Sequence, residues 1–178
     1  MHRSRTTFWR VGLVALLGGA VLLGDRRDAR ADVTSEEVEH AIRAGVQFLK
    51  GRQAADGSWQ DVDPTSRTGT TSLIVLALMT AGEKPGSPAI QRALQFLRQF
   101  RPEEINSTYA ISLQTMVFAT AEPNRDKNLI LANVEALELT QIKLGERNMW
   151  PGTWNYHIPN RPGDNSNTQY ALLGLNAA

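Results

Sequence analysis

The sequence predicts an all-α fold built from repeated helical hairpins. The segment Ala41–Leu49 returns 48 positions later as Ala89–Leu97, with five of nine residues identical. Self-similarity at a period of roughly 20–50 residues marks an array of supersecondary units, none of which buries its apolar face alone. Amphipathic helical patterns also alternate with wholly apolar ones, as outer and inner helices of such an array would.

The first unit, residues 36–82, contains one helix of each kind. Thr34 and Glu37 have the spacing of a capping box. Apolar residues then recur at i, i+4, i+8 and i+11 from Val38 to Leu49, which predicts an amphipathic outer helix. Residues 73–79 are apolar all round and predict an inner helix buried on every side, which Gly82 ends.

The second unit, residues 87–122, repeats this order. Ser87-Pro88 has the pattern of an N-cap followed by a first-turn proline, and the outer helix is expected to run to Phe100. Ser107 is the expected cap of an inner helix over residues 108–121.

The third unit, residues 126–178, has a long loop between its helices. Apolar residues at helical spacing predict an outer helix from near Asn124 or Asp126 to Leu144. A loop over residues 146–164 precedes the last inner helix. That helix reaches Ala178 without a stop signal, so we expect the chain to be the N-terminal portion of a longer protein.

Residues 1–31 have the pattern of a secretory signal peptide. A basic start, an apolar run over residues 11–23 and Ala29-Arg30-Ala31 as a cleavage site follow in that order. Thirteen apolar residues are too few to span a bilayer, which needs about 20. We therefore expect export to the periplasm or the extracellular space, with an uncleaved membrane anchor as the alternative and residues 32–178 as the folded domain.

Composition excludes several classes of function. Residues 1–31 hold six of the 19 Lys+Arg and two of the 18 Asp+Glu, which leaves 13 and 16 in residues 32–178 and a net charge of −3. This part has no basic stripe for nucleic acid or for an anionic membrane. The chain has no cysteine, which excludes a thiolate nucleophile, Cys-ligated zinc and a thioester.

Two segments carry a family resemblance. Gln53 followed by Asp56-Gly57-Ser58-Trp59, and the segment 152–156 followed by residues 164–175, resemble the QW-type repeat of the terpenoid cyclase and protein prenyltransferase superfamily. The chain is most similar to the bacterial prenyltransferase and squalene oxidase repeat proteins, which are squalene-hopene-cyclase-like. The resemblance implies a partial α/α toroid.

The same resemblance implies structural roles for three residues. Gln53 and Trp59 would tie adjacent hairpins together in the first unit. Trp154, with Gln141 as partner, would do so in the third unit. The second unit departs from the pattern, because neither Gly nor Trp follows its outer helix.

Two aspartates are the candidate catalytic residues. Asp61 and Asp63 lie where cyclases carry a D-x-D-D-T-A acid motif, but Pro64 replaces one acidic position. The alternative is a solvated acidic loop with side-chain-to-backbone hydrogen bonds. No metal site is expected, because four donors at compatible spacing are lacking and His40 lies on a polar helix face.

The candidate binding residues are Trp150, Trp154, Tyr156 and His157. Aromatic faces flanked by polar groups suit a carbohydrate or an apolar ligand. The alternative is that Trp154 and Tyr156 pack within the hairpin.

These observations favour an exported repeat domain that acts as a scaffold or binding module without a catalytic site of its own. The alternative is an isoprenoid cyclase or prenyltransferase whose catalytic residues lie in C-terminal repeats beyond this chain. No cofactor is expected. The expected partner is a protein, or an isoprenoid or carbohydrate ligand, and contact with a membrane is expected only through an uncleaved N-terminus.

Overall fold

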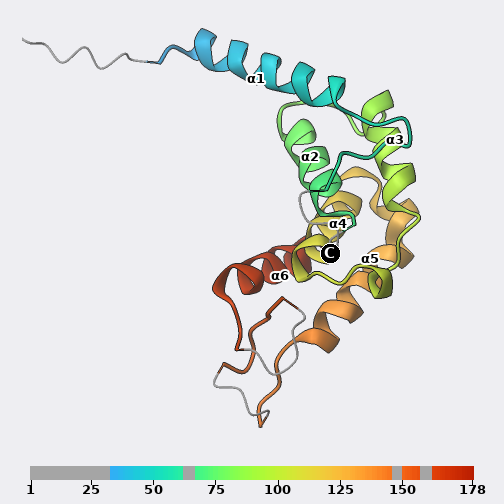
Figure 1. Ribbon diagram of the computed structural model, residues 1–178, viewed down its shortest axis with the longest axis vertical. Coiled ribbons are helices and arrows are strands. Elements are labelled where there is room, and N and C mark those ends of the chain that lie inside the picture. The colour runs from blue at the N-terminus through green and yellow to red at the C-terminus, as the bar shows by residue number, and fades with distance from the viewer. Residues whose placement is uncertain (1–32, 62–66, 146–149, 157–161) are drawn as a thin grey trace, which may run out of the picture. The chain divides into compact units, whose positions relative to one another are not determined.

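The structure is a computed structural model that describes residues 33–61, 67–145, 150–156 and 162–178. Within these ranges the chain forms six α-helices, one short 3-10 helix and no strand (Figure 1). The predicted all-α fold is therefore confirmed. The closure of the hairpins into a toroid stays a prediction.

The helices alternate between an outer and an inner position. The outer helices are α1 (Ser35–Gly51), α3 (Pro88–Leu97) and α5 (Pro123–Thr140), and the inner helices are α2 (Gly69–Thr80), α4 (Thr108–Ala121) and α6 (Asn165–Ala177). The 3-10 helix η1 (Pro102–Glu104) precedes α4. All of them belong to the compact unit Thr34–Ala178, and the chain's other unit is Met1–Val33.

Helix α4 is the centre of the packing. It contacts α2, α5 and α6, and nine of its residues are buried. Val117 and Phe118 join an apolar cluster with α2 and α3, whereas Ala110 and Ile111 join a second one with Trp154 and α6. Helix α4 thus joins α2, α3, α5 and α6 into one packed body.

The expectation that every inner helix is buried all round is wrong for α2 and α6. Leu73 of α2 is 50% exposed, and Leu172 and Leu173 of α6 are 56% and 45% exposed. The physical reason is the number of neighbours. Helix α4 has an inner helix on each side, whereas among the described residues α2 and α6 each pack closely against only one inner helix, α4.

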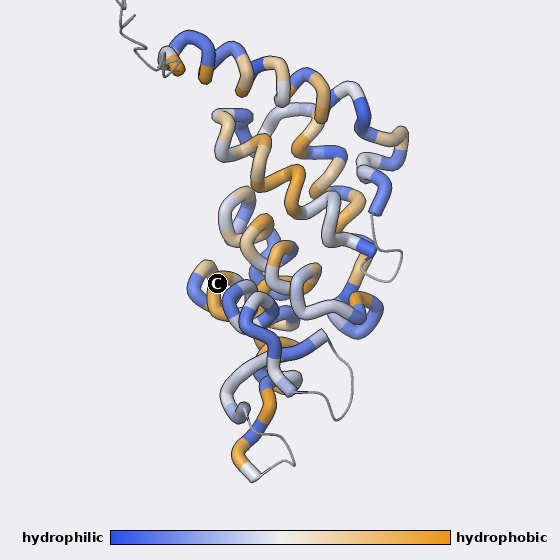
Figure 2. Tube along the Cα trace, turned by 60° about the vertical axis from the view of Figure 1, so that its left-hand side comes forward, coloured by the Kyte–Doolittle hydropathy of each residue, from blue (hydrophilic) through white to orange (hydrophobic). Residues whose placement is uncertain are grey.

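Helix α1 forms as predicted but buries little. The capping box is present, with the Glu37 amide donating to Thr34 Oγ1 at 3.2 Å and the Thr34 amide donating to Glu37 Oε2 at 2.9 Å. Hydrophilic and hydrophobic residues alternate along the helix (Figure 2). No residue of α1 is buried, although Lys50 Nζ forms an ion pair with Glu83 at 2.8 Å.

Two outer helices end earlier than their apolar pattern predicts. Helix α3 ends at Leu97 instead of Phe100, and α5 ends at Thr140 instead of Leu144. Ile142 makes backbone bonds across the loop instead, since its amide donates to Thr153 O at 3.0 Å and its carbonyl accepts from the Gly152 amide at 2.7 Å. Helix α4 has the predicted bounds, and Ser107 Oγ accepts from the Ala110 amide at 3.3 Å.

No helix among the described residues is both long enough and apolar enough to cross a membrane. The predicted signal segment, residues 1–31, lies outside the described residues.

Candidate functional site

Two tryptophans make the same contacts in the first and third units. Trp59 is 4% exposed and Trp154 is 2% exposed. The indole Nε1 of Trp59 donates to Leu49 O at 2.8 Å, and that of Trp154 donates to Leu137 O at 2.7 Å. Both carbonyls lie in the last turn of an outer helix, where backbone oxygens have no intrahelical partner.

The backbone amides of these tryptophans also have equivalent partners. Trp59 N donates to Thr71 Oγ1 at 3.0 Å, and Trp154 N donates to Thr168 Oγ1 at 3.1 Å. Each threonine lies in the first turn of the following inner helix. A single tryptophan therefore joins the end of one helix to the start of the next.

Gln53 connects the first unit to the second. Its Nε2 donates to Gly57 O at 3.0 Å and to Ala89 O on α3 at 2.8 Å, while its Oε1 accepts from Arg92. Gly57 has a φ of +92°, and a Cβ there would lie 2.3 Å from the Arg92 carbonyl oxygen. Only glycine fits this turn, because both the backbone conformation and the close approach exclude a side chain.

The second unit makes the equivalent bond without a tryptophan. Gln114 is fully buried on α4, and its Nε2 donates to Leu97 O at 3.0 Å. Leu97 is the repeat counterpart of Leu49. Asn133 Nδ2 completes the arrangement by donating to Gln114 Oε1 at 2.9 Å. The sequence pattern missed this tie because the donor lies on the inner helix and not in the preceding turn.

The structure gives Asp61 a capping contact. Its Oδ1 accepts from the Thr70 amide at 3.0 Å, and Asp164 Oδ1 accepts from the Asn167 amide at 2.8 Å at the equivalent place on α6. Asp63 lies outside the described residues. These two carboxylates therefore accept from backbone amides at the starts of two inner helices, α2 in the first unit and α6 in the third.

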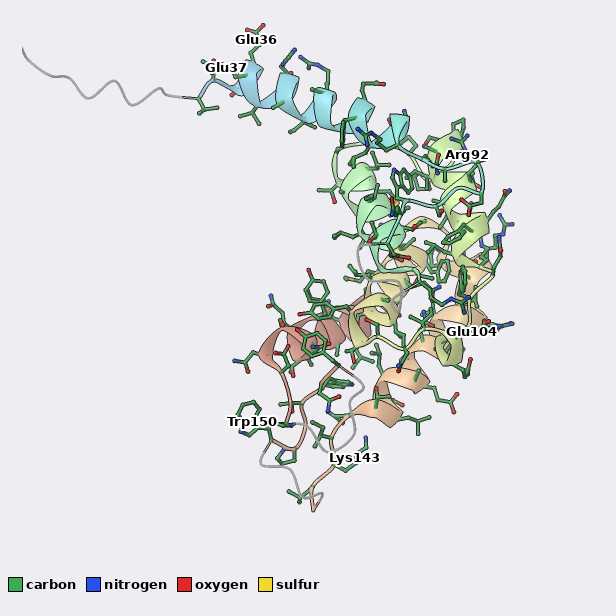
Figure 3. The ribbon with its side chains drawn as sticks, in the orientation of Figure 1. Glu36, Glu37, Arg92, Glu104, Lys143 and Trp150 are labelled. Atoms are coloured by element: carbon green, nitrogen blue, oxygen red, sulfur yellow. The ribbon has the colours of Figure 1, made fainter. Side chains whose placement is uncertain are left out.

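The four predicted binding residues are distributed over different environments. Trp150 is 45% exposed and stands out from the loop in Figure 3, and Tyr156 is 53% exposed. Trp154 is buried, and His157 lies outside the described residues. Among the three that the structure describes, the rings of Trp150 and Tyr156 are exposed to a ligand and that of Trp154 is not.

Tyr156 belongs to a group of three tyrosines that the sequence pattern did not bring together. The ring of Tyr109 on α4 lies 5.9 Å from that of Tyr156 and 4.6 Å from that of Tyr170 on α6, centroid to centroid. Both pairs are tilted, which is a favourable arrangement of aromatic rings. We call Tyr109, Tyr156 and Tyr170 the tyrosine cluster.

A chain of hydroxyls runs from the tyrosine cluster to Asp164. The Tyr109 hydroxyl donates to Ser166 Oγ, and Ser166 Oγ donates to Asp164 Oδ1 at 2.6 Å. The pKa of Tyr109 is raised, mainly by burial. The pKa of Asp164 is lowered, mainly by the hydrogen bond that Ser166 donates to it. Tyr109 is thus held as a neutral donor and Asp164 as an anionic acceptor.

A cavity of about 380 Å³ adjoins this chain, lined by Asn155, Tyr156, Pro162, Gly163 and Asp164. It offers an aromatic face, backbone polar groups and one carboxylate. In the described part of the chain no cluster of three or more His, Cys, Asp or Glu side chains could hold a metal ion. These groups suit recognition by stacking and hydrogen bonding.

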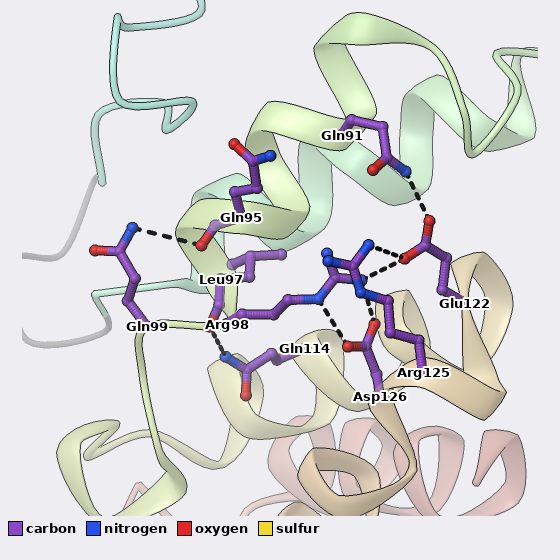
Figure 4. Close-up of polar contacts among 9 residues, drawn as sticks. All are labelled: Gln91, Gln95, Leu97, Arg98, Gln99, Gln114, Glu122, Arg125 and Asp126. Carbon is purple, nitrogen blue, oxygen red and sulfur yellow. Dashed lines mark hydrogen bonds and ion pairs between the residues drawn. The ribbon is translucent and has the colours of Figure 1, made fainter.

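A second polar network lies between α3 and α5 and was also missed by the sequence pattern. Arg98 Nε and Nη2 donate to Asp126 at 2.7 and 2.8 Å, and Nη2 donates to Glu122 at 2.6 Å (Figure 4). Gln91 Nε2 donates to Glu122 Oε1 at 2.8 Å. The hydrogen bonds that Arg98 donates to Asp126 are the main cause of its raised pKa, and the hydrogen bond that Gln91 donates to Glu122 is the main cause of the lowered pKa of Glu122.

One half of this network could have been predicted from the sequence. Glu122 and Asp126 are four residues apart and therefore lie on one face of a helix start, where negative charge is favoured. The Asp126 side chain is 2% exposed and that of Arg98 is 15% exposed. Buried charges with this degree of pairing fix the register of α3 against α5 and offer no open site.

The described residues form an all-α domain of helical hairpins, with the tyrosine cluster linked to Asp164 through Ser166. The model of the A-macroglobulin TED domain, a thioester-containing domain, matches residues 28–173. The chain belongs to this family. No curated protein and no solved structure matches it.

This match corrects the family resemblance drawn from the sequence. The chain is not a prenyltransferase, squalene oxidase or squalene-hopene-cyclase-like repeat protein, and the functions that resemblance implied fall with it. They include the repeat-protein scaffold and the isoprenoid cyclase. The acid role for Asp61 and Asp63 was drawn from the same resemblance and stays a prediction, with Asp61 in a capping contact and Asp63 outside the described residues.

The physical reason for the error is visible in the ties. Gln53 and Trp59 satisfy backbone groups at helix ends, and every fold of stacked helical hairpins has such groups. The motif therefore reports a packing requirement and not a family. The family match is consistent with export, because TED domains are found in secreted complement and macroglobulin proteins.

Proposed function

We propose that this chain serves an α-macroglobulin- or complement-like function outside the cytoplasm, through non-covalent contacts with a target protein. One observation carries the proposal. The chain belongs to a family of thioester-containing domains, yet its 178 residues include no cysteine. A thioester needs a cysteine sulfur, so these residues cannot acylate a target by that route.

The tyrosine cluster is the surface that we propose for target contact. Tyrosine is enriched at protein interfaces because one side chain supplies both apolar area and a hydroxyl. Tyr156 is more than half exposed, Tyr109 of α4 packs against it, and Tyr170 of α6 packs against Tyr109. Asp164 adds a negative charge beside it, and the adjoining cavity can accept a target side chain.

The proposed location is the periplasm or the extracellular space, reached through residues 1–31 as a signal peptide, with an uncleaved anchor as the alternative. N-terminal sequencing of the exported protein checks this step. A first residue at Asp32 is the expected result, and an intact N-terminus would indicate an anchor. Recovery of the protein only from the cytoplasm would contradict export.

The test of non-covalent contact isolates tagged full-length protein from the exported fraction of the cells that produce it. A co-purified target should dissociate in denaturant, because no covalent bond links the two chains. Tyr156→Ala should lower its recovery several-fold. Leu144→Ala is the matched control, since Leu144 is 90% exposed and lies outside the tyrosine cluster.

Two results would contradict the proposal. A target that stays attached in denaturant would show a covalent link, and equal recovery with Tyr156→Ala would exclude the tyrosine cluster. Release of the target by a simple sugar would favour a carbohydrate on the target as the group that is recognised.

A further inference from the structure

A groove distinct from the tyrosine cluster lies between η1, the start of α4 and the C-terminal half of α5. Its volume is about 350 Å³. Ile105 and Ile111, which are 0% and 1% exposed, form part of the apolar lining, together with Ala132 and Ala136 of α5. Leu139 also lines the groove and is 73% exposed, so its apolar side chain is free to contact a bound group.

Two carboxylates border this apolar surface. Glu103 of η1 and Glu135 of α5 line the groove and are exposed. Neither takes part in the ion pairs formed among the described residues. They come from two different elements that line the groove, and their charge is available to an incoming group.

The end of α5 adds to the negative potential. Leu139 and Thr140 lie in the last turn of the helix, where the macrodipole places about half a negative charge. Lys143 Nζ donates to Glu138 O at 2.7 Å, so its charge offsets part of the potential at this helix end. The two carboxylates of the lining are therefore the main attraction for a cation that enters the groove.

We infer that this groove binds a segment of a partner protein that presents a leucine-sized side chain next to a lysine or arginine. The apolar lining takes the aliphatic group, and Glu103 and Glu135 pair with the basic one. The volume lies at the lower end of the roughly 300–1,000 Å³ that is typical of small-ligand sites, which suits one or two side chains. The inference is independent of the function proposed above.

Charge distinguishes this groove from an apolar hollow between α1 and α2. The hollow lined by Ile42, Leu73, Leu76, Ala77, Thr80 and Ala81 has no charged residue in its lining. Its lining would suit any apolar group, so it does not indicate which kind of partner would bind there. The groove at η1 and α5 selects its occupant by both polarity and sign of charge.

The experiment uses the ¹⁵N-labelled full chain and three acetylated tetrapeptides, Lys-Leu-Leu-Lys, Ser-Leu-Leu-Ser and Glu-Leu-Leu-Glu. Backbone amide shifts are followed during titration. The basic peptide should shift the amides of Ala132 and Ala136 and leave that of Ala44 on α1 unmoved. It should bind more tightly than the neutral peptide, and the acidic peptide should bind least, with the differences shrinking as salt is added.

Two variants separate the charge from the apolar surface. Glu103→Gln with Glu135→Gln keeps the shape and should weaken the basic peptide by about three- to tenfold, as for two solvent-exposed ion pairs. Leu139→Ser should weaken all the peptides that bind. The matched control, Glu36→Gln with Glu138→Gln, removes the same charge outside the groove and should leave the affinity unchanged.

Three results would overturn the inference. Equal binding of all three peptides would show a purely apolar site, and shifts confined to other helices would show a different one. No binding of the basic peptide at millimolar concentration would show that the groove is not a docking site. The substituted glutamates are exposed, so the variants should fold and every result should be readable.

Discussion

Replacing Trp59 by alanine tests whether the tryptophan ties are what hold the hairpins together. The indole is 4% exposed and its Nε1 donates to Leu49 O at 2.8 Å. Removing a buried tryptophan costs about 3–5 kcal/mol, because apolar contacts are lost and a cavity remains. The Leu49 carbonyl also loses the indole donor, although the Arg52 amide still donates to it at 3.0 Å.

The loss is large relative to the stability of a domain, which is about 5–15 kcal/mol. Urea denaturation of the full chain measures it. With a denaturant slope of about 2 kcal/mol per molar urea, a loss of 3–5 kcal/mol lowers the midpoint by about 1.5–2.5 M. Trp59→Phe separates the two contributions, because it keeps most of the ring and should cost only about 0.5–1.5 kcal/mol for the hydrogen bond plus a smaller packing term.

Trp150→Ala is the matched control. Trp150 is 45% exposed, so its removal should change the free energy of unfolding by no more than about 0.5 kcal/mol. If Trp59→Ala left the midpoint where it is in the wild type, the packing role would be wrong. A smaller slope in the variant would instead mean that unfolding is no longer a single transition.

Three further predictions follow from local geometry. Gly57→Ala should destabilise the domain by about 1–3 kcal/mol because of its positive φ and the Arg92 carbonyl, whereas Gly51→Ala, where a Cβ would meet nothing within 4 Å, should be neutral or stabilising in the same urea assay. Arg98→Met should cost up to about 3–5 kcal/mol by leaving the Asp126 charge buried and unpaired, and Arg98→Met with Asp126→Leu should recover much of that loss in calorimetry. Hydrogen bonds hold the pKa of Asp164 below its usual 3.8, so this carboxylate stabilises the fold above pH 3.8 and loses that effect as the pH falls through its folded pKa. Asp164→Asn should therefore show a shallower fall in stability than the wild type in acid denaturation, and parallel curves would contradict the capping role.

The helices that sequence reasoning predicted best are those with a signal at each end. Helix α4 has its predicted bounds because Ser107 caps its start and Pro123 begins the next helix. Helix α3 was predicted too long, since Phe100 continues the apolar spacing but lies beyond the helix in the turn before η1. Apolar spacing identifies a helix more reliably than it locates the end of one.

The candidate site was only partly predictable. The loop holding Tyr156 and Asp164 was identified from its composition, but Tyr109 lies 47 residues before Tyr156 and belongs to another unit. The contact between the two rings depends on how α4 packs against α6, and no local pattern encodes that. The Arg98 network was missed for the same reason, although the four-residue spacing of Glu122 and Asp126 marked one half of it.

The carbonyls of Leu49, Leu97 and Leu137 suggest how such repeats should be counted. All three accept a side-chain hydrogen bond at the end of an outer helix, from Trp59, Gln114 and Trp154 respectively. Among the described residues, the tryptophan contact occurs at two of these three carbonyls. What recurs is an acceptor at a fixed place on the backbone, and any residue able to bring an N–H group to that point can serve. A designer extending this array could choose the donor freely at each joint and hold only the acceptor constant.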